Sequence, residues 1–465
     1  MDIFAGMKGY DIDDTICALA TPEGVGAIGV IRISGSDSLK ICNELFPSKN
    51  LLKQRANTLH VGNLENDGTV IDEVVLALFK TPKSYTGEDI IEISCHGSSF
   101  VREEILKNLI EKGARMAKEG EFTFRAFING KIDLSQAEAV ADLIASDSNA
   151  SRDLALSQLK GGYASRLRDL REQLIHFASM LELELDFSEE DVEFANKEQL
   201  EALVRELHST VLQMIDSFDR GNVFKNGIPV AIIGAPNVGK STLLNQILKE
   251  DKAIVSEFAG TTRDAIEDVF NINGVVFRFI DTAGLRETSD FVENIGIQKA
   301  KEKAESAKLI LHLMDVNDVD PTSLLEEQTE LAGVDLERNF IVFNKIDSCS
   351  EGKLKELKTV CSDASFLSAK NGDGVEALLE KLNQYAQKGM SDGEGVVVSN
   401  VRHLEALKNC DEALVRTLKG IDDGMSSELL AMDVRQALHY LGEITGEVCT
   451  DDLLGNIFSK FCIGK

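Results

Sequence analysis

The octapeptide GAPNVGKS at residues 234–241 is the feature that most constrains this chain. It fits the pattern G-x-x-x-x-G-K-[ST] and lies between an apolar run, 228–233, and a helical pattern, 242–248. Such a strand–loop–helix unit turns backbone N–H groups and a helix N-terminus towards a phosphate. We expect Lys240 to contact the β and γ phosphates and Ser241 to hold Mg²⁺. An ordinary glycine-rich turn would share this pattern, so the motif alone leaves both interpretations open.

The region around this loop alternates between apolar runs and helical patterns. The apolar runs occupy residues 228–233, 275–280, 309–316, 340–343 and 366–367. This alternation predicts a doubly wound α/β sheet, in which ligands bind beyond the carboxyl ends of the strands.

Polar motifs follow three of these predicted strands. In DTAG, at 281–284, Asp281 can reach Mg²⁺ through water and the Gly284 N–H can meet a γ phosphate. In NKID, the Asp347 carboxylate can accept two hydrogen bonds from the guanine edge, which adenine does not offer. Together the motifs predict GTP binding. The expected nucleotide contacts are Asn237, Val238, Gly239, Lys240, Ser241, Thr242, Ser256, Thr262, Asp281, Thr282, Ala283, Gly284, Asn344, Lys345, Asp347, Ser368, Ala369 and Lys370.

The residues needed for hydrolysis differ from those of Ras-like proteins. Residues 254–264, IVSEFAGTTRD, are expected to form switch I, with the Thr262 hydroxyl on Mg²⁺. The position after DTAG is Leu285, which cannot orient the attacking water, so another group must do so. Asn237 could coordinate a monovalent cation, and K⁺ there could neutralise charge where other GTPases insert an arginine.

Composition limits the other possibilities. The formal charge of −29 argues against broad electrostatic binding to nucleic acid. The best local basic stretch is 152–171, where five cations face few acids, although a solvated helix face is the favoured interpretation. The eight cysteines form no C-x-x-C pair, so neither a zinc site nor a disulfide framework is indicated. With no apolar run long enough for a membrane span and an acidic start, we expect a cytoplasmic protein.

The two ends of the chain surround the predicted nucleotide-binding region. β-rich runs at 27–34 and 72–80, a third strand around Glu92 and a helix at 101–112 predict a compact α+β domain. Residues 135–220 and those after 399 have helical spacing throughout. Neither stretch can bury its apolar faces alone, so we expect them to pack together into one helical domain.

The final helical pattern spans residues 451–461 and ends in the terminal sequence CIGK. It places its apolar residues on one face, which predicts a packed helix. The residues of that face are Leu454, Ile457, Phe458 and Phe461.

Several stretches together resemble one family along nearly the whole chain. They are TPEGVGAIGVIRISG, SYTGEDIIEISCHG, RAFINGKIDLSQAEAVADLI, GAPNVGKS, AGTTRD, DTAGLRE and TGEVCTDDLLGNIFSKFCIGK. The chain thus resembles the tRNA modification GTPase family MnmE, also called TrmE, of the TRAFAC class.

The resemblance implies a specific activity. Members are K⁺-dependent GTPases that act with an FAD-dependent partner to add an aminomethyl-type group, such as carboxymethylaminomethyl, at C5 of wobble uridine in certain tRNAs. A 5-formyl or 5,10-methylene tetrahydrofolate supplies the one-carbon unit. The resemblance implies Glu293 as the water-positioning glutamate and Cys462 as a cysteine considered for catalysis, although a buried inert thiol is an equal alternative. It also implies folate contacts at Arg32, Glu92, Lys131 and Lys465, and K⁺ ligands at Asn237, Ser256, Phe258 and Thr261.

The resemblance also implies an architecture. We expect a multidomain α/β protein in which a Ras-like G domain is inserted in a discontinuous helical domain. The expected domains are a tetrahydrofolate-binding and dimerisation domain at 1–130, helical parts at 131–226 and 388–465, and the G domain at 227–387. A homodimer that assembles with its partner into a heterotetramer is expected. The alternatives are a ribosome-assembly or regulatory switch GTPase, and a folate-binding module that carries a G domain.

Overall fold

The structure is a computed structural model that describes residues 13–186, 197–249, 268–280, 307–319, 338–391, 397–459 and 461–464. The chain divides into two compact units. The first comprises Met1–Ile144, Gln158–Leu207 and Asn409–Lys465, and the second comprises Ala145–Ser157 and His208–Lys408. Among the described helices, none is long and apolar enough to cross a membrane.

A six-stranded sheet forms the N-terminal part of the first unit. The strands follow the order β3-β4-β5-β2-β1-β6, and all neighbours are antiparallel except β1 and β6. The strands are β1 Ile16–Leu19, β2 Ile28–Ser34, β3 Thr58–Asn66, β4 Thr69–Phe79, β5 Ile90–His96 and β6 Arg115–Met116. Two helices, α1 Ser38–Leu45 and α2 Ser99–Glu111, pack against this sheet, and η1 Leu51–Lys53 follows α1.

Alternation along these strands gives the sheet one buried face and an opposite, more open face that is exposed at β3 and covered by Phe122 next to β1. Ile31 and Ile33 of β2 are fully buried in the core, whereas Arg32 between them lies on the open face. Leu59 and Val61 of β3 are exposed on that face at 69% and 62%. The predicted strands at 27–34 and 72–80 and the one around Glu92 correspond to β2, β4 and β5. Strands β1, β3 and β6 were not predicted.

A cluster of buried charges joins the sheet to helix α3, Glu121–Ile128. The Arg125 side chain is 1% exposed, and its guanidinium donates to Asp14 and to Glu88. Glu121 is equally buried and accepts from Arg115 at 2.7 Å. Burial acts to raise the pKa values of Asp14 and Glu121, but the arginine hydrogen bonds outweigh it and lower both. The carboxylates therefore stay ionised inside the domain.

We predict that Arg125→Met destabilises the N-terminal domain strongly. Removing one member of a buried ion cluster leaves Glu88 without a compensating charge, while Glu121 stays paired with Arg115, and this costs about 3–5 kcal/mol. Native-state hydrogen exchange of the α3 amides in the full chain would measure this. The matched control is Lys107→Met, which breaks an exposed α2 ion pair with Glu111 and should cost under about 1 kcal/mol. Equal protection of the α3 amides in both variants would contradict the prediction.

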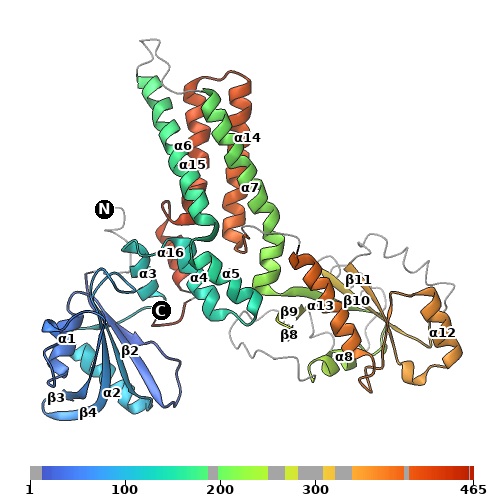
Figure 1. Ribbon diagram of the computed structural model, residues 1–465, viewed down its shortest axis with the longest axis horizontal. Coiled ribbons are helices and arrows are strands. Elements are labelled where there is room, and N and C mark those ends of the chain that lie inside the picture. Colours follow the sequence, from blue (N-terminus) through green and yellow to red (C-terminus); the bar gives the residue numbers. More distant parts are fainter. Residues whose placement is uncertain are drawn as a thin grey trace. The chain divides into compact units, whose positions relative to one another are not determined.

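The helical segments on either side of the G domain pack together, as predicted. Figure 1 shows α6 running alongside α15, and Arg435 of α15 forms an ion pair with Glu182 of α6 at 2.6 Å. Arg171 of α6 also pairs with Glu447. The helices are α4 Leu134–Ala145, α5 Asn149–Leu159, α6 Gly162–Asp186, α7 Lys197–Asn226, α14 Val401–Asp422, α15 Ser427–Thr445 and α16 Asp451–Phe458.

Two expectations for the helical segments were wrong. The basic stretch at 152–171 was expected to face few acids, but four of its arginines pair with carboxylates, and three of these arginines are exposed, as the favoured interpretation of a solvated helix face requires. Arg152 pairs with Asp153, Arg166 with Glu206, Arg168 with Asp133 and Arg171 with Glu447. The last helix ends at Phe458 instead of Phe461, although Phe461 still packs on Phe458 at a ring distance of 5.4 Å.

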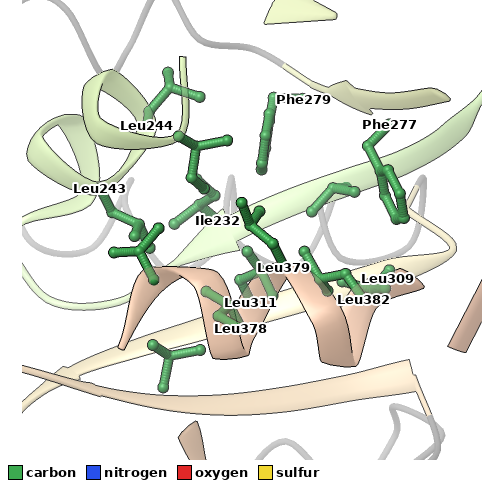
Figure 2. Packing of buried hydrophobic residues seen from close by; sticks show 14 of the residues in the cluster. Ile232, Leu243, Leu244, Phe277, Phe279, Leu309, Leu311, Leu378, Leu379 and Leu382 are labelled. Atoms are coloured by element: carbon green, nitrogen blue, oxygen red, sulfur yellow. The ribbon is translucent and has the colours of Figure 1, made fainter. Parts of the chain in front are cut away.

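The second unit contains a mostly parallel six-stranded sheet in the order β12-β11-β10-β7-β9-β8. Figure 2 shows Leu378, Leu379 and Leu382 of one helix facing Leu309 and Leu311 across the core. The strands are β7 Ile228–Ile233, β8 Asp268–Ile272, β9 Val275–Phe279, β10 Leu309–Asp315, β11 Asn339–Asn344 and β12 Ser365–Phe366. The helices are α8 Lys240–Ile247, η3 Ile346–Ser348, α12 Glu351–Val360 and α13 Val375–Ser391.

Strand β8 was not predicted and is the antiparallel member of this sheet. A two-residue turn at Asn273 and Gly274, both with positive φ, joins it to β9. Such a turn matches the twist of the paired strands. The Asn271 side chain donates to the main-chain oxygen of Asp147 at 3.2 Å, so this hairpin is tied to the connection between α4 and α5.

Candidate functional site

The loop after β7 lies where the strand order changes direction, because β7 has β10 on one side and β9 on the other. Ligands of open α/β sheets bind at such a switch point. Gly234 has φ +147°, and an added Cβ would lie 2.1 Å from the Leu313 oxygen. Helix α8 begins at Lys240, directly after Gly239 in the left-handed region. The strand–loop–helix unit predicted from the motif is therefore present.

Within this loop, Lys240 turns back over the backbone. Its Nζ donates to the carbonyl oxygens of Gly234 at 2.9 Å and Ala235 at 2.8 Å. Asn237, the proposed K⁺ ligand, is exposed and has φ +63°. The ammonium group and the N-terminus of α8 thus lie at one loop, an arrangement suited to a phosphate chain.

Asn344 connects the phosphate loop to the last nucleotide motif. Its Nδ2 donates to the Val238 oxygen at 2.7 Å, and its Oδ1 accepts from the Ala369 N–H at 2.9 Å. The residue is only 2% exposed, so both ends of its amide must be satisfied within the protein. The sequence predicts Asn344 as a nucleotide contact, which stays a prediction, and the structure adds that this residue links the loop after β7 to the loop after β12.

The predicted base-recognition residues meet next to this link. Asp347 accepts from the Ser368 hydroxyl at 2.6 Å, and that hydroxyl also accepts from the Asn371 N–H at 3.3 Å. Ser368 therefore orients the carboxylate predicted to select guanine. Lys370 is exposed beside them.

Asp315 lies beside the NKID motif and was not predicted from the sequence. It ends β10 and pairs with Lys345 at 2.7 Å. Burial acts to raise the pKa of Asp315, but hydrogen bonds from Lys345 and Asn317 outweigh it and lower the pKa. Its position at the carboxyl end of a predicted strand was the available signal, since ligands gather there.

Ser241 and Thr242 are the second and third residues of α8, and Thr242 is exposed. The other predicted residues of the nucleotide site lie outside the described residues. They are Ser256, Phe258, Thr261, Thr262, Asp281, Thr282, Ala283, Gly284 and Glu293.

A second group of functional candidates meets on the open face of the N-terminal sheet. Arg32 of β2 and Glu92 of β5 are directly paired across the strands. The Arg32 Nε and Nη2 donate to one Glu92 oxygen at 3.0 and 2.7 Å. The guanidinium carbon also lies 5.3 Å from the centre of the Tyr85 ring and 5.6 Å from that of Phe122. Neither aromatic residue was predicted to belong to a site.

The C-terminal segment reaches this pair. The Gly464 oxygen accepts from Arg32 Nη1 at 3.4 Å, and Ile463 forms a β-bridge with Glu119. Gly464 has φ +97°, and an added Cβ would lie 2.2 Å from the Leu19 oxygen, so glycine is required there. Lys465 itself lies outside the described residues.

The other two predicted residues of this region are also located. Cys462 is exposed, so the alternative of a buried inert thiol was wrong. Lys131 is exposed and its Nζ donates to the Pro82 oxygen at 2.9 Å, so its side chain contacts the loop that carries Tyr85.

Comparison with known proteins identifies similar chains along nearly the whole sequence. Residues 15–131 match the family model "GTP-binding protein TrmE N-terminus", and residues 134–462 match "MnmE helical domain". A tRNA modification GTPase MnmE of Cytophaga hutchinsonii is 52% identical over 97% of this chain and 98% of its own length. One of Christiangramia forsetii is 50% identical over 98% of this chain and 100% of its own length.

The chain belongs to the MnmE family of tRNA modification GTPases. Its architecture is accordingly that of an MnmE-family protein, with a TrmE N-terminal domain, a helical domain and a G domain. Among solved structures, the G domain of the T. maritima FeoB iron transporter is 29% identical and covers 34% of this chain and 99% of that chain. Its TM-score of 0.26 is too low to carry an argument.

We predict that Gly239→Ala greatly weakens nucleotide binding by this MnmE-family chain. An added Cβ would lie 2.3 Å from Asn344 Nδ2, in a left-handed conformation that disfavours alanine. The link from Asn344 to Val238 and Ala369 would then break. Isothermal titration with GTP should show a loss on the order of 100-fold, the worth of two buried hydrogen bonds.

The matched control is Gly352→Ala in α12 of the same domain. No atom lies within 4 Å of its added Cβ, so its GTP affinity should equal that of the wild type. Unchanged GTP affinity in Gly239→Ala would show that the Asn344 link does not support the site.

Proposed function

We propose that this chain is a K⁺-dependent GTPase that acts on wobble uridine of tRNA, together with an FAD-dependent partner and a tetrahydrofolate one-carbon donor. Membership of the MnmE family supports GTP hydrolysis in tRNA modification. The observation that carries the one-carbon part is the meeting of Arg32, Glu92 and Gly464, because it brings the two ends of the chain to one polar centre.

GTP fits the residues of the G domain. Lys240 and the α8 N-terminus provide positive charge for the phosphates, and Ser241 at the start of α8 would hold Mg²⁺. Asp347, oriented by Ser368, would accept the two donors of guanine. Thr262 and Asp281 would complete the Mg²⁺ site, and Asn237, Ser256, Phe258 and Thr261 would bind K⁺, which supplies positive charge at the phosphates when bound.

A folate fits the residues of the N-terminal domain. Glu92 would accept from the pterin N–H groups, and Arg32, Lys131 and Lys465 would bind its oxygens. The bound folate would supply the one-carbon unit that is transferred to the uridine. Arg32 and Glu92 already form a charge pair on the open sheet face, and the partly exposed Tyr85 ring lies beside it, whereas the Phe122 ring that also contacts Arg32 is fully buried. Cys462 is exposed two residues before Gly464 and is available to react, although we assign it no step.

A homodimer is supported by the same open face. Leu59 and Val61 of the edge strand β3 leave apolar surface uncovered there, each more than 60% exposed. Exposed apolar groups of this kind mark association sites when they lie together. A second copy of the chain would cover them, and the partner protein would bind this dimer.

We predict that K⁺, but not Na⁺, accelerates GTP hydrolysis, and that Glu293→Ala abolishes hydrolysis while GTP binding is retained. The physical reason is that Leu285 cannot orient water, and the resemblance to the family gives that role to Glu293. Phosphate release measured in matched K⁺ and Na⁺ buffers tests both statements. Turnover in Glu293→Ala equal to that of the wild type would remove Glu293 from this role, and equal rates in both salts would remove the K⁺ requirement.

We also predict that Arg32→Ala abolishes wobble-uridine modification while GTP hydrolysis stays at the wild-type rate. Losing the guanidinium removes the charge that would bind folate oxygens but leaves the G domain unchanged. Mass spectrometry of tRNA from a deletion strain that expresses each variant measures the modification. The control is Arg55→Ala, which removes an exposed arginine of the same domain. A fully modified tRNA pool in the Arg32→Ala strain would refute the one-carbon role, and an unmodified pool that the wild-type chain does not restore would favour a ribosomal function.

A further inference from the structure

We propose that Tyr85 and Thr123 are positioning residues of the one-carbon site. Their hydrogen bond would hold the Tyr85 ring against the Arg32 guanidinium and so prepare this arginine to bind the folate. This inference rests on the proposed function, since it assigns further residues to the same site.

The Tyr85–Thr123 contact joins the loop before β5 to helix α3. The two hydroxyl oxygens lie 2.8 Å apart, and Thr123 has no exposed surface. Burial raises the pKa of Tyr85, so its phenol stays protonated and able to take part in this bond. A buried hydroxyl pair is costly to separate, because each group would lose its partner.

The Tyr85 ring in turn contacts Arg32. Its centre lies 5.3 Å from the guanidinium carbon, within the range of a cation–π contact. Phe122, the residue before Thr123 in α3, contacts the same guanidinium at 5.6 Å. Helix α3 therefore provides one ring directly and holds the other through Thr123.

The arginine held in this way has all three of its nitrogen groups engaged. Glu92 accepts from Nε and Nη2, and the Gly464 oxygen accepts from Nη1. Two ring contacts add to these bonds and restrict the plane of the guanidinium. A side chain whose rotamers are already restricted loses less entropy when a ligand binds, so the contacts should increase affinity.

Other bonds hold the loop in place without this contact. Arg125 donates to Glu88, Asn129 donates to the Thr86 oxygen, and the Ser34 hydroxyl bonds to Glu88 and Thr86. Removing the Tyr85–Thr123 bond should therefore free the ring without unfolding the loop. This separates a positioning role from a structural one.

The test uses four variants of the full chain: Tyr85→Phe, Thr123→Val, the double variant and Thr123→Ser. Isothermal titration with 5-formyltetrahydrofolate measures the dissociation constant. Each of the first two variants should bind about fivefold more weakly, the effect of one hydrogen bond. The double variant should bind no more weakly than either single variant, because all three lack the same bond. Thr123→Ser keeps a hydroxyl and should restore wild-type affinity.

Hydrogen exchange of the N-terminal sheet provides the structural readout. The proposal expects wild-type protection in all four variants, and it is overturned if lost affinity is accompanied by lost protection. Wild-type affinity in both single variants, or additive losses in the double variant, would also overturn it. In those cases the folate role of Arg32 stands if Arg32→Ala abolishes binding. If the wild-type chain fails to bind 5-formyltetrahydrofolate, or Arg32→Ala binds it equally well, the proposed folate site itself fails.

Discussion

The nucleotide site of this protein depends on the two hydrogen bonds of one buried amide. Asn344 bonds to Val238 in the phosphate loop and to Ala369 in the base-recognition loop. Because the residue is almost fully buried, neither end of its amide can be left to water. The two loops are therefore held at a fixed spacing, which suits a ligand that has a phosphate chain at one end and a base at the other.

In the N-terminal domain, buried charges likewise hold separate segments of the chain together. Arg125 cannot remain inside the domain unless carboxylates surround it, and Asp14, Glu88 and Glu121 come from three separate segments of the chain. Their pairing with one guanidinium holds α3 against the loop that carries Tyr85. Helix α3 also packs against the last helix of the chain, because Phe124 contacts Phe458 of α16 with ring centres 5.3 Å apart.

The chain is acidic overall, and many of its arginines are paired with carboxylates. Several arginines of the basic stretch at 152–171 form ion pairs with carboxylates, such as Arg168 with Asp133 and Arg171 with Glu447. Because these arginines are paired, little uncompensated positive charge is left on the described helices between 152 and 171, in a chain whose net charge is −29.

The sequence alone determined the parts of this protein whose signals are local. The phosphate loop, NKID and the alternation around them predicted the G-domain sheet, because a motif and its flanking elements are adjacent in the chain. Family motifs at both ends located Arg32 and Glu92. Tertiary structure decided what depends on distant segments. Short strands such as β1 and β6 form through pairing with neighbours. The roles of Asn344, Asp315, Tyr85 and Thr123 arise from contacts between segments far apart in sequence. Such contacts follow from strand register and burial, neither of which is written in the spacing of residues along the chain.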